Sequence, residues 1–160
     1  MKESVRPRFL TILCILTFIG SGWGIVNSIS TYKNAEVAVG MGSEVLESVM
    51  DNIEDQVNSP EEADMLERMM GSVTEGLTVV NVKNLGIANG IASILTLIGA
   101  ILMWGLDKKG FWLYLVGITA AIIAPLMIYE GIMGMATSGW AAFTGILFSI
   151  LYYLNVKHLN

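Results

Sequence analysis

The chain has 160 residues, of which 54% are hydrophobic and only 14% are charged, and its net charge is −5. Soluble proteins average about 25% charged residues, so this composition indicates a membrane protein, and the negative charge argues against a nucleic-acid partner. The single cysteine, Cys14, excludes an intrachain disulfide framework.

The first apolar run extends from Phe9 to Val26, behind a short basic segment. Its length of about 18 residues is sufficient for a transmembrane helix. A cleaved secretory signal is the alternative, because Ser28-Ile29-Ser30 is a small-x-small site that would start the mature chain at Thr31. We expect an uncleaved anchor, since the run is longer than a usual signal-peptide core and Gly20 and Gly24 offer a flat packing strip.

An acidic region, residues 29–84, follows the first span. Residues 31–84 hold eleven acidic and three basic side chains, which gives this segment a charge of −8. Apolar residues recur at helical spacing in much of it, so two amphipathic helices are predicted, from Ala35 to Val57 and from Pro60 to Val82. We expect them to form an antiparallel helical hairpin outside the membrane.

The start of the second amphipathic helix carries the most specific local signal in the chain. Ser59 is expected as the N-cap, Pro60 at the first helical position and Glu62 as the partner of Ser59 in a capping box. Asp64 and Arg68 are four residues apart and are expected to form a weak surface ion pair. The hairpin turn is therefore placed near Ser59.

The apolar stripes of the two amphipathic helices are expected to pack against each other. A pair this small forms only a thin core, and methionine-rich surfaces adapt readily to a partner. The exposed remainder is therefore predicted to bind one. The candidate partner-binding residues are Met50, Ile53, Met65, Met69 and Leu77.

Three further apolar runs make up residues 85–160. The second span is predicted to begin near Leu85, after a polar junction at residues 81–84. The polar turn at residues 107–110 separates it from a third span, predicted from Phe111 to Tyr129. Each run is long enough to cross about 30 Å of hydrocarbon as a helix, so together they form a membrane hairpin.

The last span is predicted from about Trp140 to Leu154, with an earlier start as the alternative, after a loop at residues 130–139. In the third span, Pro125 removes a backbone hydrogen bond and should bend the helix near its end. Small residues recur at four-residue spacing in every span, which predicts faces that pack on other helices. The predicted helix-packing residues are Gly20, Gly24, Gly86, Gly90, Gly117, Ala121 and Gly145.

The distribution of lysine and arginine predicts the orientation. These residues occur before the first span, at Lys108 and Lys109, and at Lys157, whereas residues 130–139 contain none. By the positive-inside rule, both termini are cytoplasmic and the acidic hairpin is extracytoplasmic. Aromatic residues form two expected interfacial belts, with Trp104, Trp112, Tyr152 and Tyr153 inside and Trp23, Tyr129 and Trp140 outside.

The spans contain none of the groups that usually carry chemistry in a bilayer. No Asp, Glu, Lys, Arg or His lies well inside a predicted span, and the only histidine, His158, has no recognisable partner. We therefore expect no catalysis and no cofactor. Asn89 is the most polar side chain in a span; an interhelical hydrogen bond is favoured over a substrate contact.

Two metal hypotheses are disfavoured. Helical spacing explains Met69 and Met70 as members of an apolar stripe, although these two are soft donors suited to Cu(I). The other methionines expected on the same side of the membrane are Met65, Met133 and Met135. The acidic residues lack an Asp-x-Asp-x-Asp-Gly loop, so a solvated face is favoured over a calcium site. No metal ion is expected.

The segment Arg6-Pro7-Arg8-Phe9-Leu10-Thr11, leading into the apolar run that ends at Gly20, resembles the start of small uncharacterised bacterial four-span membrane proteins of the bacteroidete type. The resemblance covers the first span and the general layout. It implies that the protein lies in a bacterial inner membrane, and it assigns no functional residue to this chain. The large first and small second outer loops are also similar to the topology of tetraspanins and claudins, without the cysteines of those families.

The sequence thus predicts an all-α membrane protein, a four-helix bundle with an extracytoplasmic helical hairpin between spans 1 and 2. Residues 1–28 are expected to form the cytoplasmic N-terminus and the first span, and residues 29–84 the hairpin. Residues 85–160 are expected to form the other three spans and the cytoplasmic C-terminus. The expected function is non-enzymatic, a scaffold or accessory protein that presents its acidic hairpin to an envelope partner or a second copy. The alternative is an oligomeric transporter or channel subunit.

Overall fold

A computed structural model describes residues 7–54, 59–129 and 131–159. All regular structure in these ranges is helical. After the last long helix comes a 3₁₀ turn, Val156–His158. The six α-helices are α1 (Arg8–Lys33), α2 (Ala35–Glu54), α3 (Pro60–Gly76), α4 (Val79–Trp104), α5 (Lys109–Ile128) and α6 (Gly131–Tyr153).

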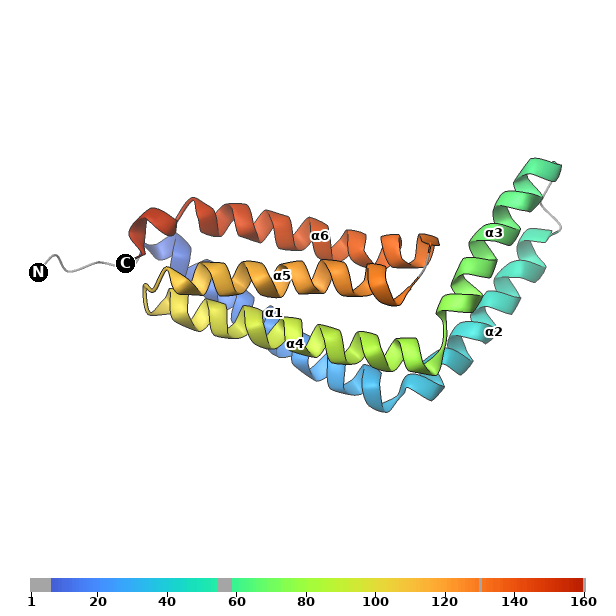
Figure 1. Cartoon of the computed structure of the whole chain (residues 1–160), viewed down its shortest axis with the longest axis horizontal. Helices are drawn as coiled ribbons and strands as arrows, with labels where there is room; N and C mark the ends of the chain where they lie inside the picture. Colours follow the sequence, from blue (N-terminus) through green and yellow to red (C-terminus); the bar gives the residue numbers. More distant parts are fainter. Residues whose placement is uncertain (1–6, 55–58, 130, 160) are drawn as a thin grey trace, which may run out of the picture.

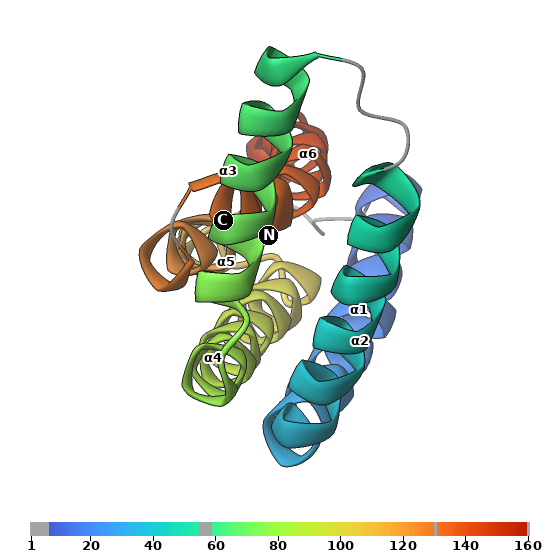
Figure 2. The same cartoon turned by 90° about the vertical axis from the view of Figure 1, so that its right-hand side faces the viewer.

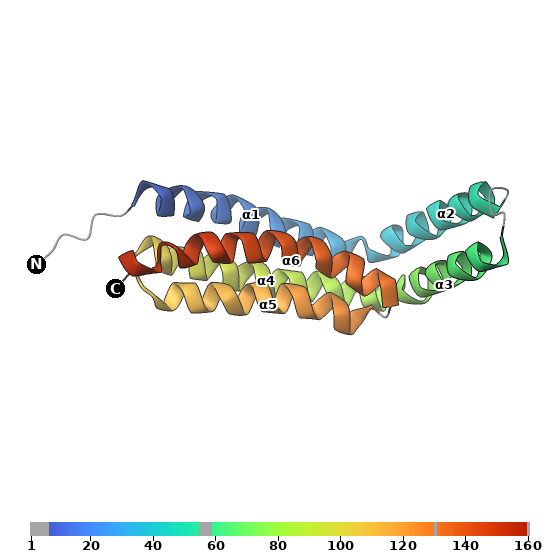
Figure 3. The same ribbon diagram turned by 90° about the horizontal axis from the view of Figure 1, so that it is seen from above.

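Four of these helices, α1, α4, α5 and α6, are long and apolar enough to cross a membrane. They lie side by side in one bundle (Figures 1 and 3). Helix α1 packs on α4, α4 packs on α5, and α5 packs on α6. The start of α1 and the end of α6 lie together at one end of the bundle, which we call the terminal end.

Helices α2 and α3 extend beyond the opposite end of the bundle (Figures 1 and 3). We call them the projecting pair. They make little contact with each other, and Figure 2 shows them as two separate columns. One contact lies near the bundle, where a Cβ atom on Gly42 would be 2.6 Å from Cδ2 of Leu77. The turn expected before Ser59 falls mainly on residues 55–58, outside the described ranges.

The capping box predicts the start of α3 correctly. Ser59 has extended backbone angles and its hydroxyl accepts the backbone N–H of Glu62 at 3.2 Å, with Pro60 at the start of the helix. The expected ion pair is also present, because Nη2 of Arg68 lies 3.0 Å from Oδ2 of Asp64. Both of these side chains are largely exposed, so the pair contributes about 0–1 kcal/mol of stability.

The predicted junction between the second amphipathic helix and the second span is wrong. Helix α3 ends at Gly76, not at Val82, and α4 already begins at Val79, so residues 81–84 lie inside α4. The hydroxyl of Thr78 accepts the backbone N–H of Asn81 at 3.2 Å. This N-cap satisfies a terminal donor of α4, and the polar residues that follow are tolerated in its first turn.

The predicted loop at residues 130–139 is wrong as well, because α6 begins at Gly131, which agrees with the earlier start considered for the last span. Glu130 lies outside the described residues. Thr137 and Ser138 do not interrupt the helix, since their hydroxyls donate to the carbonyls of Met133 and Gly134 at 2.8 and 2.7 Å. Gly131 has a φ of +64°, which favours glycine where the chain turns into α6.

Helix α1 continues past the expected end of the first span to Lys33. Ser28 is buried there against α4, where a Cβ atom on Gly86 would lie 3.1 Å from the Ser28 carbonyl oxygen. The helix stops at Asn34, whose N–H donates to the carbonyl of Ser30 at 2.9 Å. The segment considered as a signal-peptide cleavage site is therefore part of the α1–α4 contact.

Most of the large, fully buried side chains gather at the terminal end. They come from α1, α4, α5, α6 and the end of the chain, and Tyr152 at their centre has no exposed surface. This cluster joins the two ends of the chain to the middle helices. Its members are Leu10, Leu13, Cys14, Met103, Phe111, Tyr114, Tyr152 and Leu159.

A candidate polar cleft and a candidate interaction surface

Glycines set the spacing of the helices. The closest approach is between α4 and α5, where a Cβ atom on Gly99 would lie 2.7 Å from the backbone nitrogen of Tyr114. A Cβ atom on Gly110 would lie 2.5 Å from the carbonyl oxygen of Gly99. Gly110 belongs to the predicted polar turn, and Gly99 is not among the predicted helix-packing residues.

The predicted packing glycines fall into two groups. Gly86 and Gly90 face Ser28 of α1, Gly117 faces Thr96 and the backbone of Ala92, Gly24 faces Ser93, and Gly145 faces Ile118. A Cβ atom on Gly20 would meet nothing within 4 Å. Gly20 and Ala121 line a cleft inside the bundle, and Gly24 and Gly145 border the same cleft.

This cleft follows from the way α1 crosses the bundle. Helix α1 begins beside α6 and ends beside α4 (Figure 1), so it has little contact with α6 over its length. A contact between the two is a hydrogen bond of 2.7 Å between the hydroxyls of Thr17 and Tyr152. The cleft has a volume of about 330 Å³ and is lined by residues of all four bundle helices.

The lining is polar but uncharged. Of the described residues that form it, none carries a formal charge, and seven bear an amide or an aliphatic hydroxyl. We call this feature the polar cleft. Its amide and hydroxyl residues are Thr17, Ser21, Asn27, Asn89, Ser93, Thr96 and Thr144, and the other lining residues are apolar or small apart from Tyr114.

Some of these polar groups are satisfied within the protein. Ser21 and Thr96 share a hydrogen bond of 2.9 Å between α1 and α4. Among the described residues, however, the side-chain amides of Asn27 and Asn89 and the hydroxyl of Ser93 have no hydrogen-bond partner. The interhelical hydrogen bond expected of Asn89 is thus not made to any described residue.

Toward the terminal end the polar cleft is closed. Thr17 lies at the cleft and bonds Tyr152, whose ring is 4.9 Å from that of Tyr114, centroid to centroid. Both rings are buried within the apolar cluster of the terminal end. In a single chain, the polar surface therefore ends at the rings of Tyr114 and Tyr152, which we call the aromatic floor.

The projecting pair provides a second candidate site. Of the predicted partner-binding residues, Met50 and Met65 are exposed and Met69 is 37% exposed. Ile53 is half-buried, and Leu77 packs near Gly42. Leu77 is therefore an internal contact of the projecting pair and is less available to a partner than the sequence indicated.

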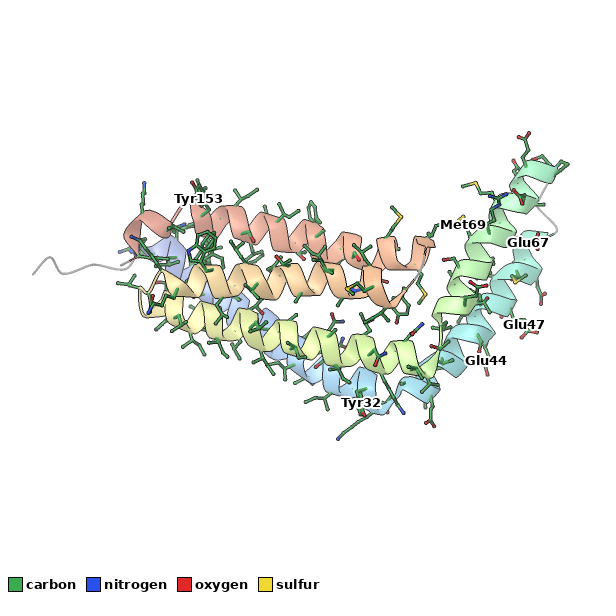
Figure 4. The ribbon with its side chains drawn as sticks, in the orientation of Figure 1. Tyr32, Glu44, Glu47, Glu67, Met69 and Tyr153 are labelled. Atoms are coloured by element: carbon green, nitrogen blue, oxygen red, sulfur yellow. The ribbon has the colours of Figure 1, made fainter. Side chains whose placement is uncertain are left out.

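Exposed apolar side chains also occur on α2 outside the predicted partner-binding residues. Val37, Met41 and Val45 on α2 are 61–63% exposed and follow one another at four-residue spacing. Their signal was weak because Gly40 and Gly42 interrupt the segment. Acidic residues accompany them, as Figure 4 shows for Glu44, Glu47 and Glu67 together with Met69.

The base of the projecting pair is fixed to the bundle. A Cβ atom on Gly76 would lie 2.8 Å from the sulfur of Met133 in α6. At the base of α2, Nζ of Lys83 in α4 lies 3.8 Å from Oε1 of Glu36 and 5.9 Å from the ring centroid of Tyr32. Met133, one of the methionines considered as Cu(I) donors, therefore packs against the end of α3.

The fold defines a multi-pass helical membrane protein. Comparisons with protein-family models, curated proteins and solved structures found no match for this chain.

Proposed function

We propose that this protein is a non-enzymatic membrane scaffold or accessory subunit, which presents the projecting pair to an envelope partner or a second copy. The carrying observation is the exposure of Met41, Val45 and Met65, each above 60%, on helices that contact each other little. Apolar side chains on an elevated helical surface favour association with another protein.

The charge of the projecting pair favours a basic partner. Described acidic residues lie along both helices, and Arg68 is the one basic residue described in α2 and α3. A negative surface of this kind steers a basic protein toward it and repels anionic lipid headgroups. Methionine side chains would then adapt to the partner's apolar contacts.

The proposal places the protein in a bacterial inner membrane with both termini in the cytoplasm. The orientation rests on the basic residues of the terminal end, which are Arg8, Lys108, Lys109 and Lys157, and on the excess of acidic residues in the projecting pair. The projecting pair is then extracytoplasmic and accessible to other envelope proteins.

The interaction surface is tested by the double variant Val45→Asp/Met65→Asp. Charges at these apolar positions should reduce crosslinking to the partner or to a second copy at least tenfold in native membranes, because each carboxylate loses solvation in an apolar contact. Membrane insertion should be unchanged. The measurement is chemical crosslinking followed by mass spectrometry of the captured complexes.

The matched control is Ser43→Asp/Thr74→Asp, which adds the same charge at exposed polar positions of the same two helices. It should retain crosslinking close to that of the wild type. Equal loss in both double variants would assign the effect to charge alone, and no loss in either would show that the projecting pair is a passive connector.

The orientation is tested with single cysteines in a Cys14→Ser background. A cysteine at Ser48, which is exposed on α2, should react with an impermeant maleimide added to intact cells. A cysteine at Lys108 should react only after permeabilisation. Labelling of Lys108→Cys in intact cells would reverse the proposed topology.

The polar cleft favours one alternative, a subunit of an oligomeric transporter or channel. Its uncharged amide and hydroxyl groups lie within helices that are long enough to span a membrane. Because Tyr152 and Tyr114 close it in a single chain, a continuous path would require a second copy. Solute or ion flux in proteoliposomes would favour this alternative over a scaffold.

A further inference from the structure

The polar cleft contains hydrogen-bonding groups that lack partners among the described residues. Asn89 and Ser93 are half-buried, and Asn27 is exposed at the edge of the cleft, six residues before the end of α1. Helices α1 and α4 each have 26 residues, about 39 Å, whereas the hydrocarbon core is about 30 Å thick. Asn89 is ten residues from the start of α4, so it lies about 15 Å inside that end of the helix. An amide at this depth has no bulk water to bond.

An unsatisfied amide in the surroundings of Asn89 carries a free-energy penalty. Asn27 and Asn89 both line the polar cleft, and neither bonds to another described residue. An occupant with its own donors and acceptors would satisfy both amides, as well as the hydroxyl of Ser93. The cleft therefore selects a molecule with a polar group.

The lining also selects against charge. A charged headgroup in the polar cleft would lose hydration without gaining a counter-charge, because the described lining holds no acidic or basic side chain. Amide and hydroxyl side chains both donate and accept hydrogen bonds. The chemistry that fits them is an uncharged hydroxyl group.

The shape of the site indicates that the occupant is a lipid. The polar cleft lies where α1 diverges from α6, and apolar side chains of α1, α5 and α6 take part in its lining. They are Leu16, Ile118 and Phe148. A tail that leaves between α1 and α6 would contact this apolar surface and then the surrounding bilayer.

We propose that the polar cleft binds the uncharged, hydroxyl-bearing headgroup of a neutral lipid of the diacylglycerol type, with its acyl chains leaving between α1 and α6. Asn27 and Asn89 hold the hydroxyl, and the aromatic floor at Tyr114 and Tyr152 stops it from passing to the terminal end. This site does not depend on the proposed role of the projecting pair.

Gly20 and Gly22 provide a sharp test, because a side chain can be added at either position without a clash. A Cβ atom at each would meet nothing within 4 Å, but only Gly20 belongs to the cleft lining. Gly20→Leu fills the cleft, whereas Gly22→Leu makes the same change outside it. Both variants are expected to fold like the wild type.

The experiment uses the full-length protein in phosphatidylcholine vesicles with a diacylglycerol that carries a photoactivatable diazirine in one acyl chain. Crosslinked peptides should come from the segments of α1 and α6 that border the cleft. Labelling should fall at least fivefold in Gly20→Leu and change less than twofold in Gly22→Leu. Unlabelled diacylglycerol should compete, and phosphatidylglycerol with the same acyl chains should not.

Several results would overturn the proposal. Equal labelling of the two leucine variants, or equal competition by phosphatidylglycerol, would identify the probe as ordinary boundary lipid. Competition by free glycerol as effective as that by diacylglycerol would assign the site to a water-soluble polyol. If a bifunctional crosslinker joined the peptides around Gly20 of two chains, and the lipid probe did not label these peptides, a second copy would be the occupant.

Discussion

Gly99→Ala is expected to destabilise the protein by about 1–3 kcal/mol, the usual cost of forcing extra volume into a packed contact. The new methyl group would lie 2.7 Å from the Tyr114 backbone nitrogen and 2.8 Å from the Gly110 carbonyl oxygen. Because these are backbone atoms, no side-chain rotation relieves the clash, and α4 must move away from α5. Helices in lipid associate largely through such close packing.

Cys14 offers a direct measurement of this effect. It is the only cysteine, and its side chain is fully buried in the cluster at the terminal end. Its rate of reaction with a fluorescent maleimide during heating in detergent therefore reports opening of that cluster. Gly99→Ala should shift the labelling transition to a lower temperature than in the wild type.

Gly22→Ala is the matched control, since it makes the same substitution in a bundle helix where nothing lies within 4 Å of the new Cβ atom. Alanine is favoured over glycine in a helix by roughly 0.5–1 kcal/mol, so this variant should be slightly more stable than the wild type. Coincident transitions for the two alanine variants would show that the α4–α5 contact does not limit stability.

Tyr152→Ala should cost about 3 kcal/mol or more, the range measured when a large buried aromatic side chain is removed. Tyr152 has no exposed surface, packs its ring 4.9 Å from that of Tyr114, and bonds Thr17 of α1 at 2.7 Å. Its removal leaves a cavity and deletes a link between α1 and α6. Unfolding in mixed micelles with increasing dodecyl sulfate, followed by circular dichroism, measures the loss.

The adjacent residue provides the control for this prediction. Tyr153 is 67% exposed, and Tyr153→Ala should change stability by less than about 0.5 kcal/mol, as most surface substitutions do. Tyr152→Phe should fall between the two, because it keeps the packing and deletes only the hydroxyl contact. If both alanine variants unfold at the same detergent fraction, the aromatic floor does not hold α1 to α6.

The short-range features of this fold were accessible from the sequence. Four apolar runs predicted four helices that are long and apolar enough to cross a membrane, because hydrophobicity and length are properties of a single segment. The cap at Ser59 and the ion pair of Asp64 with Arg68 were also predicted, since both join residues within five positions. Local rules failed at the span boundaries, where Thr78 caps α4 and Thr137 bonds within α6.

The candidate sites depended on longer-range geometry. Asn27, Asn89 and Thr144 are distant in sequence, and the crossing of α1 from α6 to α4 determines that they line one cleft. In the same way, the contact between Gly99 and Gly110 depends on the turn that folds α5 back on α4. Hydrophobic periodicity specifies which segments become helices, but the directions in which helices cross are fixed by the packing of side chains and backbones between them.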